Sequence, residues 1–218
     1  MTDRVLVVPD SGERANLAAF LARAVRLDDS AVVRMRRRDD AHVVAWVTTG
    51  FDTIASRVVA ARLRPDDIVA AADGLLHALD AAGEEIDPGF PMDSAWRGAL
   101  PPDGGWVHVD DLPARLLIDL ARQGTEVAAE HGGHGPPASL LEQEVLAVDG
   151  GGEQVGITMR TVFALAAMGF VPGGDVESAV VDPAELVRVR AARTWLRLDA
   201  RYGSVAARRG GDIPLSVL

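Results

Sequence analysis

The 218-residue sequence predicts an α+β fold with two small domains. Residues 186–209 alternate apolar and polar side chains, which is typical of strands that bury one face. Residues 13–27 place apolar side chains three and four positions apart, which is typical of a helix. Residues 87–105 are rich in proline and glycine, and we interpret them as a connector. This connector separates an N-terminal α+β domain at 1–86 from a C-terminal domain at 106–218, in which helices precede an antiparallel β-meander.

The N-terminal domain is expected to follow the order β-α-β-β-α-α. Its first helix should begin after Asp10, because an aspartate three residues before Glu13 resembles a capping box. Its last helix should begin at Pro65, because proline and the two acids that follow it favour a first helical turn. The elements are expected as a strand at 4–8, a helix at 13–27, a hairpin of strands at 31–35 and 42–48, a helix at 52–63 with a strand at 57–63 as its alternative, and a helix that begins at 65.

The C-terminal domain is expected to contain helices followed by the meander. Phe90 and Trp96 should order part of the connector, and Asp110 and Asp111 should cap a helix that reaches Glu130. The other elements are expected as a strand at 106–109, a helix at 139–148 with a terminal strand as its alternative, a strand at 155–157, a helix at 161–168 and the meander at 186–209. This order resembles a winged-helix arrangement, and the resemblance implies binding of nucleic acid.

The meander concentrates positive charge in an acidic chain. Residues 186–209 hold seven arginines and one acid, Asp199, whereas the whole chain has a net charge of −10. If the strand registers match, one outward face gathers the following side chains: Arg188, Arg190, Trp195, Arg197 and Arg208. Arginine favours planar contact with carboxylate or phosphate, and tryptophan offers a stacking plane. We therefore predict a binding face here, with simple solvation of the arginines as the alternative.

The composition excludes several kinds of chemistry. The chain has no cysteine and no lysine, and its 22 basic residues are all arginine. A thiolate nucleophile, a cysteine metal site, a Schiff base and a P-loop lysine are therefore excluded, and we expect no cofactor. Complete use of arginine suggests the codon bias of a GC-rich bacterial genome. The sequence has no apolar run of about 20 residues and no signal-peptide pattern, so we expect a cytoplasmic protein without a membrane span.

Few residues have the types and spacing that catalysis or metal binding requires. Glu130, His131 and His134 have metal-ligand side chains, but two glycines interrupt them, and we expect an exposed loop rather than a metal site. The paired acids at 66–67 and 110–111 are better explained as helix caps than as catalytic carboxylates. The sequence therefore predicts neither catalytic residues nor a metal site.

These observations favour a non-catalytic binding or adaptor protein. Its partner is expected to be an acidic protein surface or a second copy of the chain, held by the basic meander. One alternative is a nucleic-acid-binding regulator built on the winged-helix-like order. The other is an enzyme with an Asp/Glu/His site between the domains, near Trp96, Trp106 and His108.

Overall fold

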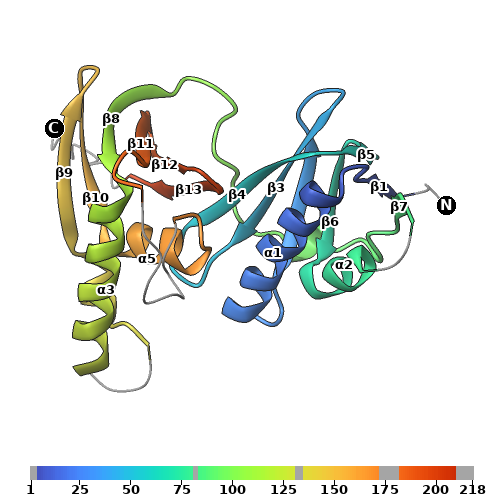
Figure 1. Ribbon diagram of the computed structural model, residues 1–218, viewed down its shortest axis with the longest axis horizontal. Coiled ribbons are helices and arrows are strands. Elements are labelled where there is room, and N and C mark those ends of the chain that lie inside the picture. The colour runs from blue at the N-terminus through green and yellow to red at the C-terminus, as the bar shows by residue number, and fades with distance from the viewer. Residues whose placement is uncertain (1–3, 81–82, 131–134, 172–181, 210–218) are drawn as a thin grey trace, which may run out of the picture.

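The computed structural model describes residues 4–80, 83–130, 135–171 and 182–209 (Figure 1). Its α-helices are α1 (Ser11–Leu27), α2 (Ala72–Leu79), α3 (Ala114–Glu130), α4 (Ala138–Glu142) and α5 (Met159–Ala167), and a short 3-10 helix spans Asp93–Ala95. Its strands are β1 (Val5–Val7), β2 (Val32–Arg37), β3 (His42–Thr48), β4 (Ile54–Ala60), β5 (Arg62–Arg64), β6 (Asp67–Ala71), β7 (Glu85–Ile86), β8 (Val107–Pro113), β9 (Glu144–Gly150), β10 (Glu153–Thr158), β11 (Leu186–Ala192), β12 (Trp195–Ala200) and β13 (Gly203–Arg208). The predicted α+β class is confirmed.

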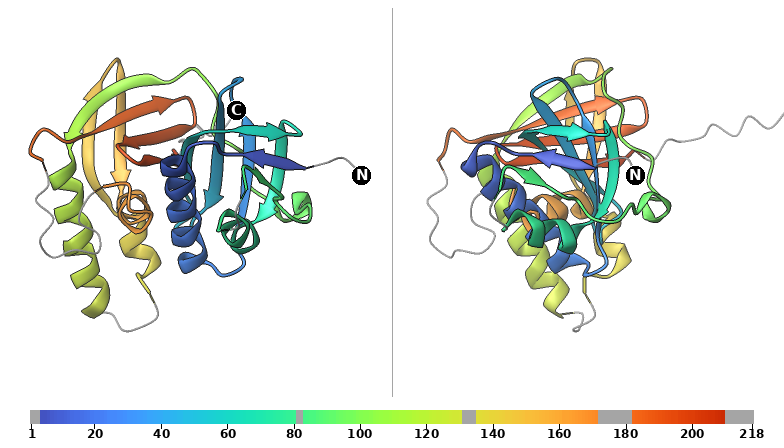
Figure 2. Two further views of the ribbon diagram at one scale, coloured as in Figure 1. Left: turned by 45° about the vertical axis from the view of Figure 1, so that its right-hand side comes forward. Right: turned by 90° about the vertical axis from the view of Figure 1, so that its right-hand side faces the viewer.

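One antiparallel sheet of eight strands runs through both halves of the chain, in the order β6-β2-β3-β4-β13-β12-β11-β8. Two small sheets, β5-β1-β7 and β10-β9, lie toward opposite ends of the molecule (Figure 1). The helices gather on one side of the strands (Figure 2). The molecule therefore has a helical side and, opposite to it, an outer face of the eight-stranded sheet.

The large sheet is assembled from two units that share one order of elements. Each unit contains a strand, a helix and three antiparallel strands: β1-α1-β2-β3-β4 in the N-terminal half and β10-α5-β11-β12-β13 in the C-terminal half. Their last strands pair with each other, and Ala55 of β4 lies opposite Val205 of β13. This pairing makes the two halves one continuous sheet.

Aromatic side chains join the two halves beneath this pair of strands. Phe20 of α1 and Phe170, which follows α5, are each 1% exposed, and their rings stack at 6.1 Å between centroids and 8° between planes. Phe51 and Phe163 form a second contact across the halves, at 6.0 Å. The main hydrophobic core contains buried residues from both halves. The halves are therefore packed on a shared core.

Two sequence predictions are confirmed closely. The Asp10 side chain accepts a hydrogen bond from the Glu13 backbone N–H at 2.8 Å, and α1 begins at the next residue, Ser11. The three meander strands β11, β12 and β13 pair antiparallel, with Val189 opposite Leu198 and Leu198 opposite Val205. The helix cap and the strand alternation both depend on residues that are close together in the chain, so the local sequence is sufficient to predict them.

The predicted N-terminal order β-α-β-β-α-α is wrong between residues 52 and 71. The expected helix at 52–63 is replaced by strands β4 and β5, as its alternative, a strand at 57–63, indicated in part. Strand β4 forms because it pairs with β3 on one edge and β13 on the other. Such pairing overrides local helical spacing. Pro65 does not start a helix, and residues 67–71 form strand β6 before α2 begins at Ala72. Asp66 and Asp67 pair with Arg37 and Arg34 instead of capping.

Three predictions in the C-terminal half are also corrected. Asp110 and Asp111 belong to strand β8, and helix α3 begins only at Ala114. The predicted helix at 139–148 ends at Glu142 and is followed by strand β9, which was its alternative. The hairpin β9–β10 separates α4 from α5, and the meander continues the N-terminal sheet, so the architecture is not a helix pair followed by a wing. None of the described helices has both the length and the apolar character needed to cross a membrane.

Candidate interaction surface on the eight-stranded sheet

The predicted binding residues lie on one face of the sheet. Because paired residues of an antiparallel sheet share a face, the register aligns Arg190 with Arg197, and Trp195 with Arg208. Arg188 lies two residues before Arg190 and therefore joins them. We call this outward surface of β11–β13 the Arg/Trp face, comprising Arg188, Arg190, Trp195, Arg197 and Arg208. The intervening Val187, Val189, Leu196 and Leu198 are buried on the helical side.

All four tryptophans of the chain pack together on this outer face. Trp46 and Trp195 are 7% and 6% exposed, and Trp96 and Trp106 pack against the same small apolar cluster. The guanidinium of Arg208 lies 4.4 Å from the centroid of the Trp195 ring. The expectation that Trp195 offers a free stacking plane is therefore wrong, because its own sheet and Arg208 cover it.

The connector is attached to the sheet through this cluster. Trp96 donates its indole N–H to the Gly98 carbonyl at 2.6 Å, and Trp106 donates to the Pro102 carbonyl at 2.9 Å. Burial of the two rings against the sheet holds the intervening chain across its outer face. Trp96 thus orders the connector as expected, whereas Phe90 is 89% exposed and does not.

Carboxylates of the same molecule balance much of the positive charge. The Nε atom of Arg188 lies 3.2 Å from Asp111. The Nε atoms of Arg190 and Arg197 lie 3.1 and 2.8 Å from Asp199, although neither Nε–H points at an acceptor. Arg197 donates to Asp199 through Nη2 instead, at 3.1 Å. One carboxylate therefore serves two guanidinium groups, and the face carries much less net charge than its arginines alone suggest.

Asp199 and Asp111 are themselves held in place by neighbouring polar groups. Ser204 donates its hydroxyl to Asp199 at 2.6 Å. His108 lies 3.2 Å from Asp111, and this contact, followed by that from Arg188, holds the pKa of Asp111 below its usual value. The carboxylate of Asp111 is thereby favoured in its charged form, and the hydroxyl of Ser204 fixes the position of the Asp199 carboxylate.

Two arginines at one end of the meander have no carboxylate partner among the described residues. Arg193 lies in the turn between β11 and β12, and Arg208 pairs across the strands with Trp195 beside that turn. By contrast, Arg201 and Arg209 contact Glu185 and Glu153 at 3.6 and 2.8 Å. The uncompensated charge of residues 186–209 is therefore concentrated at Arg193 and Arg208.

The described residues near Trp96, Trp106 and His108 do not form the alternative enzyme site. Trp96 and Trp106 belong to the apolar cluster, and the nearest carboxylate partner of His108 is Asp111, which also pairs with an arginine. No group of three or more metal-ligand side chains converges within the described parts of the chain. His131 and His134, which together with Glu130 were expected to lie in an exposed loop, are outside the described residues. The structure therefore does not test that expectation.

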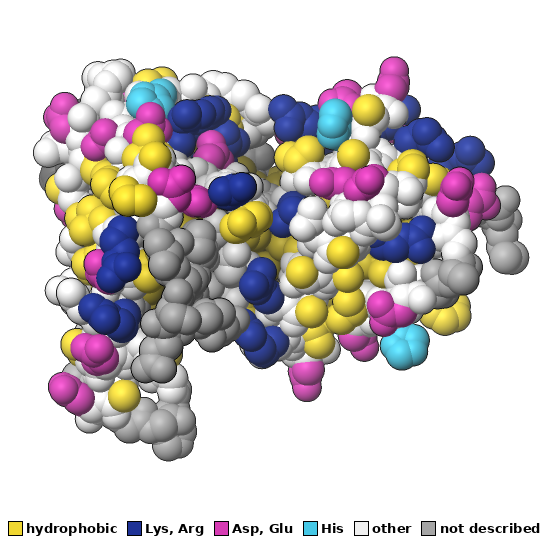
Figure 3. All heavy atoms as spheres, viewed as in Figure 1, with side chains coloured by type: hydrophobic (Ala, Val, Ile, Leu, Met, Phe, Trp, Pro, Cys, Tyr) yellow, Lys and Arg dark blue, Asp and Glu magenta, His cyan; other side chains and the backbone are white. Residues whose placement is uncertain are grey.

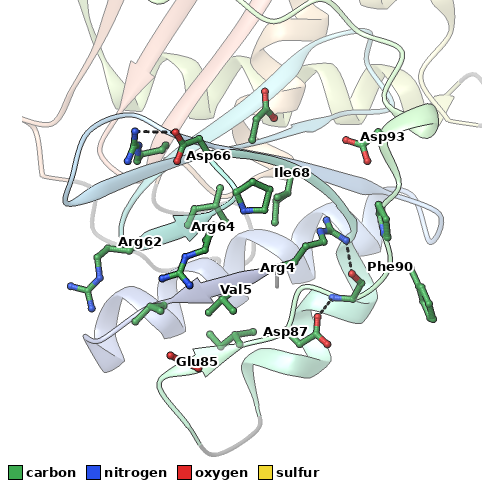
Figure 4. A pocket seen from close by; sticks show the side chains of 18 of the residues that line it. Arg4, Val5, Arg62, Arg64, Asp66, Ile68, Glu85, Asp87, Phe90 and Asp93 are labelled. Carbon is green, nitrogen blue, oxygen red and sulfur yellow. Dashed lines mark hydrogen bonds and ion pairs between the residues drawn. The ribbon is translucent and has the colours of Figure 1, made fainter. Parts of the chain in front are cut away.

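Sequence reasoning missed a large hollow at the free end of the N-terminal half. It lies over the small sheet β5-β1-β7, and its lining includes Arg62 and Arg64 (Figure 4). These two arginines alternate with the buried Leu63. This period of two indicates a strand with outward arginines, in agreement with the strand at 57–63 that was the alternative to the predicted helix.

The fold is that of sliding clamps. A DNA polymerase sliding clamp from Bacillus subtilis superposes with a TM-score of 0.57 at 14% identity, over 97% of this chain and 66% of the clamp chain. The beta subunit of DNA polymerase from Streptococcus pyogenes gives a TM-score of 0.58 at 10% identity, over 95% and 65%. The chain thus spans slightly less than two thirds of the length of these proteins, and at such identity the likeness establishes the fold alone.

The chain belongs to the family described as Domain of unknown function (DUF8185), whose model matches residues 101–212, more than half of the sequence. Residues 1–98 match a second family, Domain of unknown function (DUF8010). The matched ranges meet inside the connector predicted at 87–105, whose bounds stay a prediction. Comparison with curated proteins finds no match.

Proposed function

We propose that this protein is a non-catalytic binding protein that holds an acidic protein segment against the outer face of its sheet. Similarity to structures described as DNA polymerase sliding clamps supports a binding role over a catalytic one. The charges and the packing of the Arg/Trp face support this position for the contact.

The observation that carries this proposal is the pair of uncompensated arginines, Arg193 and Arg208, beside the tryptophan cluster. Both are exposed, and a guanidinium without an internal carboxylate is free to make bidentate contact with one from a partner. Arg208 is already oriented by the Trp195 ring beneath it. A pre-oriented side chain loses less conformational entropy on binding, which favours affinity.

The other arginines of the face are assigned a supporting role. Arg188, Arg190 and Arg197 already contact Asp111 or Asp199, so a partner carboxylate would have to compete with groups that are fixed in place. We therefore expect them to contribute less to binding than Arg193 and Arg208.

The proposal is tested by fluorescence anisotropy with a fluorescein-labelled deca-glutamate peptide. Exposed charge contacts contribute about 0.2–1 kcal/mol each, so the double variant Arg193→Glu/Arg208→Glu should weaken binding by about tenfold. Binding should also weaken as salt is raised. A matched control reverses two exposed arginines of α3, Arg115→Glu/Arg122→Glu, and should change peptide binding little. Absence of binding, or an equal loss in the control, would contradict the proposal.

A second candidate function, binding of duplex DNA, is favoured by one observation on the helical side. Figure 3 shows arginine side chains over α1 and over α3 on the same face of the molecule. Helix α1 has three arginines and one glutamate, in a chain of net charge −10. Several of the fold's solved neighbours are described as clamps of DNA polymerase.

The two candidate functions make opposite predictions for the same variants. Binding of a labelled DNA duplex should fall with Arg115→Glu/Arg122→Glu and be insensitive to Arg193→Glu/Arg208→Glu. Its affinity should also fall steeply with salt, because phosphate contacts release counterions. No binding at low salt would remove the DNA candidate and leave the peptide result unaffected.

A further inference from the structure

The hollow at the end of the N-terminal half has a volume of about 1460 Å³. Its floor includes Val5 and Val7 of β1, and its walls come from β5, β7 and the chain at 87–93 (Figure 4). Small-molecule pockets usually measure about 300–1,000 Å³ and enclose their ligand. The size of this hollow therefore suits a macromolecular partner.

Opposite charges line the two sides of the floor. Val5 pairs with Arg64, and Val7 pairs with Arg62 on one side and with Glu85 on the other, so these side chains share the outward face. We call Arg62 and Arg64 the basic row. Leu6, Leu63 and Ile86 occupy the opposite face and are buried in the core.

The acidic row consists of Glu85 and Asp87, which lie beyond the central strand. Neighbouring strands are about 4.8 Å apart, so the two rows are separated by about 10 Å. Among the described residues, no ion pair joins a carboxylate to Arg62 or Arg64. Figure 4 shows the rows on either side of Val5.

An exposed aromatic ring projects at one end of this surface. Phe90 is 89% exposed, although the chain beside it is held firmly. Arg4 donates to the carbonyls of Gly89 and Val69, and the Gly89 N–H donates to Asp87 at 2.8 Å. A fixed backbone that presents a large apolar side chain to solvent is typical of an interface anchor.

We propose that a second copy of this chain docks on this surface, related by a twofold axis parallel to β1. Rotation about that axis exchanges the two sides of the floor, so the basic row of each copy meets the acidic row of the other. It also leaves each Phe90 at the Arg4 end, where both rings can be buried. One surface that carries both signs and an apolar floor is self-complementary, as a twofold interface requires.

A partner of one charge fits this surface less well. A wholly acidic segment would be repelled by Glu85, Asp87 and Asp93, and a wholly basic one by the basic row. The proposal is separate from the Arg/Trp face and does not depend on it.

Sedimentation velocity over a range of protein and salt concentrations tests the proposal. The wild type should form a dimer that weakens as salt is raised. Reversal of either row, Arg62→Glu/Arg64→Glu or Glu85→Arg/Asp87→Arg, should give a monomer. The variant with both rows reversed should dimerise again, and a mixture of the two single-row variants should form a heterodimer.

Phe90→Ser provides a second measurement that does not depend on charge. The ring is exposed, so its removal should leave folding unchanged, as circular dichroism would verify, yet it should weaken the dimer about tenfold or more. The control Arg115→Glu/Arg122→Glu on α3 should remain dimeric. A monomeric wild type, a dimer that survives both single-row reversals, or failure of the double reversal to restore it would each overturn the proposal.

Discussion

Replacement of Phe170 by alanine tests whether the two halves unfold as one unit. Phe170 is 1% exposed, its ring stacks on Phe20, and it lies over Gly203, which has no side chain to fill a cavity. Deletion of a buried phenylalanine side chain costs about 3–5 kcal/mol, and loss of a stacked pair belongs to the upper part of that range. We therefore expect Phe170→Ala to lower the free energy of unfolding by about 4 kcal/mol.

The assay is urea unfolding followed by tryptophan fluorescence and far-UV circular dichroism. The four tryptophans lie on the outer face, away from Phe170, so their fluorescence reports unfolding of the sheet rather than the local substitution. Both signals should shift together, with a fall in Tm of roughly 10 °C. The control Phe90→Ala, at a protein concentration too low for association, should change stability by less than about 0.5 kcal/mol. A loss below about 1 kcal/mol, or two separate transitions, would show that the halves are energetically independent.

Three further predictions concern single contacts. Gly203→Ala should destabilise the protein by about 1–3 kcal/mol in the same urea assay, because a Cβ there would overlap the Phe170 ring and lie 2.7 Å from a backbone carbonyl; unchanged stability would contradict the packing described. Asp199→Asn should lower the free energy of unfolding by about 1–2 kcal/mol, because two partly buried guanidinium groups lose their shared carboxylate; a neutral result would mean that solvent already screens them. The lowered pKa of Asp111 means that its favourable contacts persist above its unfolded-state pKa and disappear as pH falls through the lowered value. Carbon-detected NMR titration should show that this pKa rises toward its usual value in His108→Gln, and no change would assign the shift to another group.

Part of the candidate surface could be predicted from sequence because strand alternation is a local property. The period of two in residues 186–209 correctly placed Arg190, Arg197 and Arg208 on one side of a sheet. The same pattern does not reveal which acids lie opposite. Arg188 contacts Asp111, which is 77 residues away in the chain and belongs to a segment expected to be a helix cap.

The connector illustrates the same limit. Its proline and glycine content correctly predicts irregular chain, but composition does not indicate that Trp96 and Trp106 pack against the apolar cluster that contains Trp195. Nor does it indicate that Trp195 is buried beneath Arg208, which removes the stacking plane on which part of the binding prediction depended.

Local sequence was sufficient for the N-terminus of α1 and for the meander, because the Asp10 cap and the strand alternation act between residues a few positions apart. Distant contacts were needed to make residues 54–60 a strand and to balance the arginines with carboxylates. The reason is physical: the pairing of β4 with β13 and the burial of Phe20 on Phe170 gain free energy only when both partners are in place, and neither partner's own segment encodes the other.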